Sequence, residues 1–150
     1  MNAIQLLQAW IDAGTKIDNL WSMYIVVHLG LFWFFFLVHR PLLIVERMIA
    51  IFAYVCFGWI NGNALIHAYA LLEAVRRDLV TKAARELAQT PETLRILSSV
   101  SYEGRDELIL LTHVGGFALV VTLFLLRNVM IRRYFAVYPD QTMQKPALTD

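Results

Sequence analysis

The sequence predicts an all-α integral membrane protein with three transmembrane helices, and its composition and its apolar runs carry that prediction. The 150 residues are 59% hydrophobic and 17% charged, which is more apolar surface than a soluble domain of this size can bury. Uncharged apolar runs occur at about 19–38, 48–72 and 108–126. At about 1.5 Å per residue, each run can cross a hydrocarbon layer of about 30 Å. We therefore expect one three-helix membrane domain over 19–135.

Residues 1–18 are predicted to form a short amphipathic helix in the membrane interface. Their apolar side chains recur at helical spacing with polar side chains opposite, and Trp10 suits the depth of the lipid headgroups. Gly14 and Thr15 are expected to end this helix before the first span. The alternative is a frayed tail, because a segment this short is a marginal helix on its own.

Aromatic residues mark the ends of the first span. Trp21 and Tyr24 lie near one end, and Trp33 lies towards the other. This arrangement is typical of side chains anchored at the two membrane surfaces. Pro41 follows the span closely, so we expect a tight connection and an antiparallel pairing of the first two spans.

The second span is predicted to continue as a helix beyond the membrane, within an extramembrane helical segment over 73–107. No proline interrupts the chain between Pro41 and Pro91, and the residues after Leu72 combine an apolar face with oppositely charged i,i+4 pairs. Pro91 is expected to begin a further short helix. Residues 136–150 form a polar C-terminal tail that we expect to be extended.

The positions of the charges bear on the orientation in the membrane. Three crossings place the N-terminus and 73–107 on one side, with seven Lys and Arg residues, and the first turn and the C-terminus on the other, with six. These counts do not decide the orientation by the positive-inside rule. Arg127, Arg132 and Arg133 follow the third span, which favours a cytoplasmic C-terminus in a bacterial-type inner (plasma) membrane.

Several function classes find no support in the sequence. A net charge of +1 with dispersed basic residues gives no basis for binding nucleic acid. Cys56 is the single cysteine, so the chain cannot form an intramolecular disulfide or a C-x-x-C motif. The common nucleotide-binding, serine-hydrolase, zinc-protease and calcium-binding motifs do not occur. We therefore expect a protein that is not an enzyme.

Each apolar run contains one histidine: His28, His67 and His113. Counted from the side of the long loop, they lie eight, four and five residues into their helices, so all three fall in the same half of the bilayer. Neutral imidazoles at one depth are candidate ligands for the iron of haem b, or for copper or zinc. The alternative, which we favour, is that each ring hydrogen-bonds to a neighbouring helix.

Small residues predict where two helices pack closely. Gly58 and Gly62 form a G-x-x-x-G pair on the second span, and Thr112 and Gly116 form a similar pair on the third. Such spacing lets two helix backbones approach each other. We therefore expect the second and third spans to pack together, within the chain or across an oligomer.

Polar residues predict the inward face of the second span. Cys56, Asn63 and His67 share one face by their spacing, whereas Asn61 points elsewhere. Buried amides cost free energy unless they are hydrogen-bonded. At least one of the two asparagines is therefore expected to bond to another helix or to another protomer.

These observations favour a small non-catalytic membrane subunit that assembles with other membrane proteins, or with itself, into a larger complex. Its expected partners are the lipid bilayer and either other membrane-protein subunits or further copies of the chain. Two alternatives stay open. One is a haem- or quinone-associated membrane anchor of an electron-transfer complex that uses His28, His67 or His113. The other is a small oligomeric channel lined by Asn63, His67 and Thr112.

Overall fold

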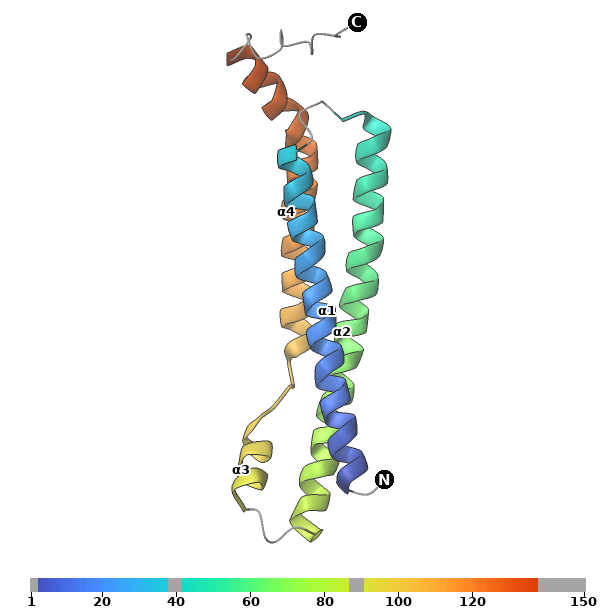
Figure 1. The fold of residues 1–150 in the computed structure, drawn as a ribbon, viewed down its shortest axis with the longest axis vertical. Helices are drawn as coiled ribbons and strands as arrows, with labels where there is room; N and C mark the ends of the chain where they lie inside the picture. Colours follow the sequence, from blue (N-terminus) through green and yellow to red (C-terminus); the bar gives the residue numbers. More distant parts are fainter. Residues whose placement is uncertain (1–2, 38–41, 87–90, 138–150) are drawn as a thin grey trace, which may run out of the picture.

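The computed structural model describes residues 3–37, 42–86 and 91–137, which form four helices (Figure 1). Their bounds are α1 Ala3–Leu37, α2 Ile44–Glu86, α3 Pro91–Ser99 and α4 Arg105–Val137. α1, α2 and α4 run side by side in a long bundle, and α3 is a short helix beside the end of α2 (Figure 1). The start of α1 and the whole of α3 lie at one end of the bundle, and the end of α4 lies at the other.

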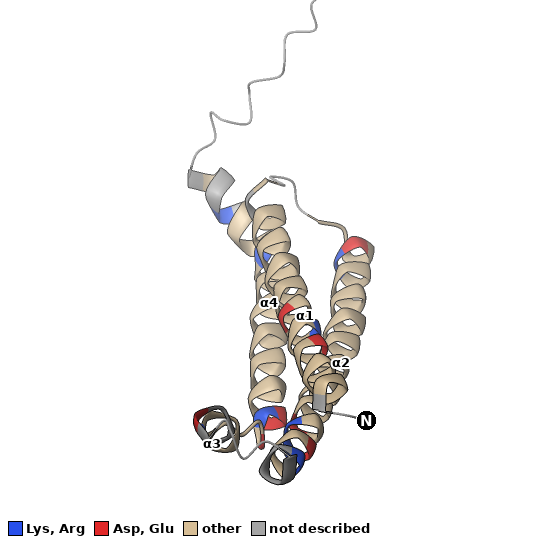
Figure 2. Ribbon diagram, turned by 60° about the horizontal axis from the view of Figure 1, so that its bottom comes forward, with Lys and Arg blue, Asp and Glu red and all other residues tan. Residues whose placement is uncertain are grey.

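The predicted fold class is confirmed in its main features, because the described chain is helical and three of its helices are long and apolar enough to cross a membrane. These candidate spans are Ile4–Phe35, Ile44–Lys82 and Arg105–Ile131. Figure 2 places the charged residues at the two ends of the bundle and on the first half of α1. The connection around Pro41 and the tail beyond 137 lie outside the described residues.

α1 is one continuous helix, and it does not end at Gly14 as the sequence led us to expect. Leu6, in the first half of α1, packs against Val75 and Leu79 on the extension of α2. A glycine inside a helix costs only about 1 kcal/mol relative to alanine. Burial of the side chains on both sides of Gly14 offsets that cost. The first half of α1 is therefore part of the bundle, paired with the extension of α2.

α2 is the central helix, since it contacts α1, α3 and α4. Beside α1 and α4 it contributes to two apolar clusters. The first consists of Ala13, Ile17, Leu65, Ala68, Leu72 and Ile109, and the second of Leu42, Tyr54, Val120 and Phe124. At the second cluster the amide of Asn128 bonds to both the N–H and the C=O of Leu42, each at 3.1 Å, which joins the start of α2 to α4.

A buried carboxylate holds the α3 segment against α2. Glu73 is 7% exposed, and it accepts hydrogen bonds from Arg76 at 2.7 Å, from Arg77 at 2.9 Å and from the backbone N–H of Tyr102 at 3.2 Å. Arg76 also donates to the carbonyl of Leu97 at 2.9 Å. Hydrogen bonds to charged groups are stronger than neutral ones. Glu73 thus fixes the loop that leads into α4.

Candidate functional site

Five polar side chains meet where α1, α2 and α4 come together inside the uncharged part of the bundle. This polar layer consists of Tyr24, His28, Tyr54, Asn61 and His113. From the sequence, three histidines were expected at this depth, and one of Asn61 and Asn63 was expected to bond to another helix. Asn61 does so, whereas Tyr24 and Tyr54 were not assigned to this layer. The sequence did contain a clue to Tyr24, because it lies four residues before His28 and therefore on the same face of the helix.

His28 has a complete set of hydrogen bonds as a neutral ring. Its Nδ1 lies 2.7 Å from the carbonyl oxygen of Tyr24, and its Nε2 lies 2.6 Å from the hydroxyl oxygen of Tyr54. A carbonyl oxygen only accepts, so Nδ1 carries the proton and Nε2 accepts from the Tyr54 hydroxyl. This bond joins α1 to α2 in the interior.

His113 and Asn61 connect all three long helices. The Nε2 atom of His113 lies 3.0 Å from Oδ1 of Asn61, and the Nδ2 atom of Asn61 donates to the carbonyl of Leu20 at 3.1 Å. Asn61 is 3% exposed, so both of its amide atoms are used inside the bundle. The Nδ1 atom of His113 lies 2.9 Å from the carbonyl of Ile109 on its own helix.

The ring of Tyr24 lies between the two histidines. Its centroid is 4.0 Å from that of His28 and 4.6 Å from that of His113, and its hydroxyl donates to the carbonyl of Thr112 at 3.0 Å. The sequence had suggested Tyr24 as an aromatic anchor at the membrane surface. The structure directs it into the bundle instead, where its hydroxyl satisfies a backbone carbonyl of α4.

Gly116 is the point where the polar layer is most closely packed. A Cβ atom at this position would lie 2.9 Å from Nε2 of His28, 3.2 Å from the hydroxyl of Tyr54 and closer still to the hydroxyl of Tyr24. Real Cβ atoms do not come this close to such atoms. Glycine at 116 is therefore what allows α4 to approach α1 and α2.

The three predicted histidines do not all converge. His28 and His113 both contact Tyr24, whereas His67 is exposed on the surface of α2. Both Nε2 atoms in the layer are engaged by protein hydrogen bonds, so a haem iron could be bound only if one of these bonds were broken. Among the residues that the structure describes, no group of three or more His, Cys, Asp or Glu side chains is placed to hold a metal ion.

The inward face of α2 is the one that carries Asn61, and not the face of Asn63 and His67. Helix rotation explains the difference, because the buried residues Leu65, Ala68 and Leu72 lie on the Asn61 side. Asn63 is half-buried, and its amide donates to the carbonyl of Trp59 on the same helix at 2.8 Å.

The hydroxyl of Thr112 likewise donates within its own helix, to the carbonyl of Leu108 at 2.8 Å. Asn63, His67 and Thr112 were the predicted lining of a channel. Two of them bond to their own helices and His67 lies on an exposed surface of α2. A channel formed by several copies of the chain stays a prediction.

A second feature, the α2–α4 groove, runs along the outer contact between these two helices. It has a volume of about 500 Å³ and a mainly apolar lining. Its lining residues are Tyr54, Val55, Gly58, Trp59, Gly62, Asn63, Ile66, Ile109, Leu110, His113, Val114 and Phe117. A Cβ atom at Gly62 would lie 3.3 Å from the ring of His113, whereas at Gly58 it would meet nothing within 4 Å. One glycine of the G-x-x-x-G pair thus contacts α4, and the other opens into the groove.

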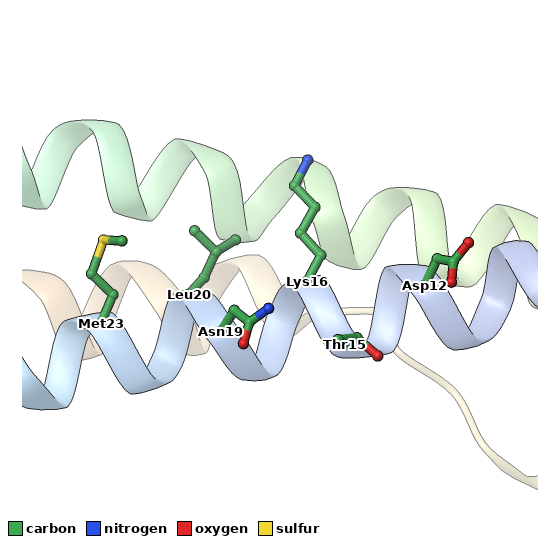
Figure 3. A pocket seen from close by; sticks show the side chains of 6 residues that line it. All are labelled: Asp12, Thr15, Lys16, Asn19, Leu20 and Met23. Carbon is green, nitrogen blue, oxygen red and sulfur yellow. The ribbon is translucent and has the colours of Figure 1, made fainter.

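A further hollow lies on the outer side of α1 alone (Figure 3). Two of its polar side chains, Asp12 and Thr15, bond within that helix. Asp12 accepts from Gln8 at 2.8 Å, and the hydroxyl of Thr15 donates to the carbonyl of Ile11 at 3.1 Å. These local bonds leave no converging set of polar groups, so this hollow is not a candidate site.

Comparison with known proteins gives no match, since neither a protein-family model nor a curated protein nor a solved structure is similar to this chain. The polar layer and the α2–α4 groove are the two features on which we base the functional proposal.

Proposed function

We propose that this protein is a non-catalytic integral membrane subunit that binds a transmembrane helix of another membrane protein in the α2–α4 groove. The observation that carries the proposal is the groove itself, which has an apolar lining and an open glycine, Gly58, on its floor.

The outer surface of the bundle supports a position in the membrane. Large apolar side chains are exposed around the uncharged stretches, including Phe52 at 70%, Trp59 at 74% and Leu111 at 70%. Soluble proteins rarely expose continuous apolar surface on this scale. Lipid chains or apolar segments of other proteins are the surroundings that such a surface suits.

The shape of the groove supports a helix as its occupant. Its lining covers residues 54–66 on α2 and 109–117 on α4, which is between about three and four turns of α2. The described lining contains no residue of α1, so α1 packs on another side of the α2–α4 pair. A further helix in the groove would complete a four-helix arrangement, and Gly58 would let its backbone come close.

The internal bonding of the polar layer supports a role without catalysis. The side chains of Tyr24, His28, Tyr54 and Asn61 bond to one another or to backbone carbonyls. These bonds hold the bundle together and do not point polar groups at a substrate. For the haem or quinone alternative, the histidines would first have to leave these partners.

Site-specific photocrosslinking in native membranes tests the proposed partner. A photoreactive amino acid at Val114, in the groove, should form an adduct with an apolar transmembrane segment of another protein, identified by mass spectrometry. The same probe at Leu119, which is exposed on α4 outside the groove, should not form that adduct.

A matched pair of glycine variants tests whether the adduct forms in the groove. Gly58→Ile fills the groove and should abolish the adduct at Val114, whereas Gly115→Ile should leave it unchanged, because both glycines have open space beside them but only Gly58 lines the groove. An adduct with lipid alone, or with a second copy of this chain, would contradict the proposed partner. An adduct that survives Gly58→Ile would contradict the proposed site.

We also propose that the C-terminus lies in the cytoplasm of a cell bounded by a bacterial-type inner membrane. The support is the run of arginines that follows the third span. In a Cys56→Ser background, a cysteine at Arg133 should resist a membrane-impermeant thiol reagent in intact cells, and a cysteine at Ser99 should react. The reverse pattern would invert the orientation.

A further inference from the structure

We propose that the Asn61–His113 pair is a proton-binding site inside the bundle, at which His113 holds a proton on each ring nitrogen. The inference comes from the atoms that surround the ring. It does not depend on the partner proposed for the α2–α4 groove.

Both nitrogens of His113 face oxygen atoms. Nδ1 lies 2.9 Å from the carbonyl oxygen of Ile109, and Nε2 lies 3.0 Å from Oδ1 of Asn61. Carbonyl and amide oxygens accept hydrogen bonds and cannot donate them. A neutral imidazole has one N–H, so it would leave the lone pair of the other nitrogen directed at an oxygen lone pair.

Rotating the amide of Asn61 does not remove this mismatch. The rotated amide would donate from Nδ2 to a neutral His113, but its Oδ1 would then face the carbonyl of Leu20, which now accepts from Nδ2 at 3.1 Å. The unmatched contact would move from His113 to Leu20. With the ring of His113 in the orientation that the structure gives, every contact has a donor only when the ring carries two protons.

The surroundings of the ring suit a delocalised positive charge. The centroid of Tyr24 lies 4.6 Å from that of His113, and that of Trp21 lies 6.1 Å away. An aromatic ring attracts a cation within about 6 Å of its centroid, a distance that Tyr24 satisfies. Among the described residues, Tyr24 is the titratable side chain whose ring contacts His113. Tyr24 also contacts His28 on α1, which bonds to Tyr54 on α2.

His28 provides the internal contrast. Its Nδ1 faces the carbonyl of Tyr24, but its Nε2 faces the hydroxyl of Tyr54, which can donate. All contacts of His28 are therefore matched by a neutral ring. The two histidines share one layer, yet their hydrogen-bond partners call for different protonation states.

Proton binding at His113 has a consequence for packing. The Nε2–H bond to Asn61 joins α4 to α2, and the Asn61 bond to Leu20 continues the link to α1. Loss of the proton from Nε2 would turn the first of these bonds into a contact between two acceptors. The site thus couples one proton to the association of three helices.

Solid-state NMR of the full-length protein, with ¹⁵N-labelled histidine in lipid bilayers, tests the proposal. At about pH 6, close to the range where histidine titrates, His113 should show two protonated ring nitrogens and His28 only one. A His113→Gln variant assigns the signals. One protonated nitrogen on His113 under conditions where the exposed His67 shows two would overturn the proposal.

Two substitutions at Asn61 separate a chemical effect from a folding effect. Asn61→Leu removes the acceptor, so His113 should keep one N–H only. Asn61→Asp keeps an acceptor beside Nε2 and loses the donor to Leu20, so His113 should keep both protons. If the ring had the same number of protons in both variants, the assignment of Asn61 as the second acceptor would be wrong.

Discussion

The bundle has two seams along α2 and α4 that differ in what covers them. At the inner seam α1 lies over both helices, and the polar layer fills the space with hydrogen bonds as short as 2.6 Å between Tyr54 and His28. At the outer seam nothing in the described chain covers the α2–α4 groove, whose lining is apolar. The inner seam is completed by the chain itself, and the outer seam suits an external helix.

Glycines show the same difference most directly. Gly116 at the inner seam has three polar atoms around the position of a Cβ, whereas Gly58 at the outer seam has none within 4 Å. Both belong to small-x-x-x-small pairs in the sequence. The spacing therefore identifies glycines at which helices can approach, but only the packing tells which of them have a neighbour.

The largest expected loss of stability is that of Gly116→Ala, which would disrupt the packing at the inner seam. The added methyl group would clash with the hydroxyl of Tyr24 and with Nε2 of His28. Overpacking of this kind typically costs about 1–3 kcal/mol. Unfolding in detergent micelles, followed by circular dichroism, should show the loss.

Gly115→Ala is the matched control, because the position of its Cβ has no atom within 4 Å. It should not reduce the free energy of unfolding. Equal stability of the Gly116 and Gly115 variants would mean that the inner seam is not tightly packed at Gly116.

The sequence was sufficient to predict where the long helices lie in the chain, but not how each helix is rotated about its own axis. The lengths and hydropathy of the apolar runs predicted three spans, and the absence of proline between Pro41 and Pro91 predicted the long extension of α2. The continuity of α1 was missed because the cost of Gly14 is small beside the burial of its neighbours. Which side chains face inward depends on how helices are turned about their axes, and at about 100° per residue Asn63 and His67 lie about 160° and about 120° around α2 from Asn61.

The same limit applies to the candidate site. Two of the three intramembrane histidines reach one layer, but Tyr24, Tyr54 and Asn61 complete it through hydrogen bonds between residues 26 to 88 positions apart in the chain. No local spacing encodes such pairs. Tyr24 also looked like an interfacial aromatic, since a tyrosine near the end of an apolar run fits either role.

A moderate loss of stability is expected from Tyr54→Phe. This substitution removes the hydrogen bond to His28 at the inner seam and keeps the aromatic ring that borders the groove. Nε2 of His28 would lose its donor in the interior. An unsatisfied buried acceptor costs about 1–3 kcal/mol, and we expect the lower part of this range here, because one bond is lost and no atoms are forced together as they are at Gly116. A double-mutant cycle with His28→Leu measures the coupling by unfolding in micelles, and a coupling of zero would contradict this hydrogen bond.

A small gain in the free energy of unfolding is expected from Gly58→Ala at the outer seam. The Cβ atom enters open space, and alanine is more favourable than glycine within a helix by about 0.5–1 kcal/mol. The isolated subunit should therefore unfold at slightly higher denaturant concentration. A loss of stability would show that α4 or another segment already contacts Gly58.

The smallest expected change in stability is that of Gly62→Ala. This position borders both seams, so a gain at one is offset by a loss at the other. The alanine Cβ would lie 3.3 Å from Cδ2 of His113, so the imidazole must move by a few tenths of an ångström. That displacement would strain its bond to Asn61 and offset most of the gain in helix propensity of about 1 kcal/mol. The free energy of unfolding should stay within about 0.5 kcal/mol of the wild-type value.

In the His113→Gln background the ring is absent, so the same Gly62→Ala substitution should become stabilising, as at Gly58. The difference between the two backgrounds, measured by unfolding in micelles, isolates the contact between Gly62 and the ring. If Gly62→Ala stabilised the protein equally in both backgrounds, His113 would not be held against α2, and the inner seam would be looser there than the hydrogen bond to Asn61 implies.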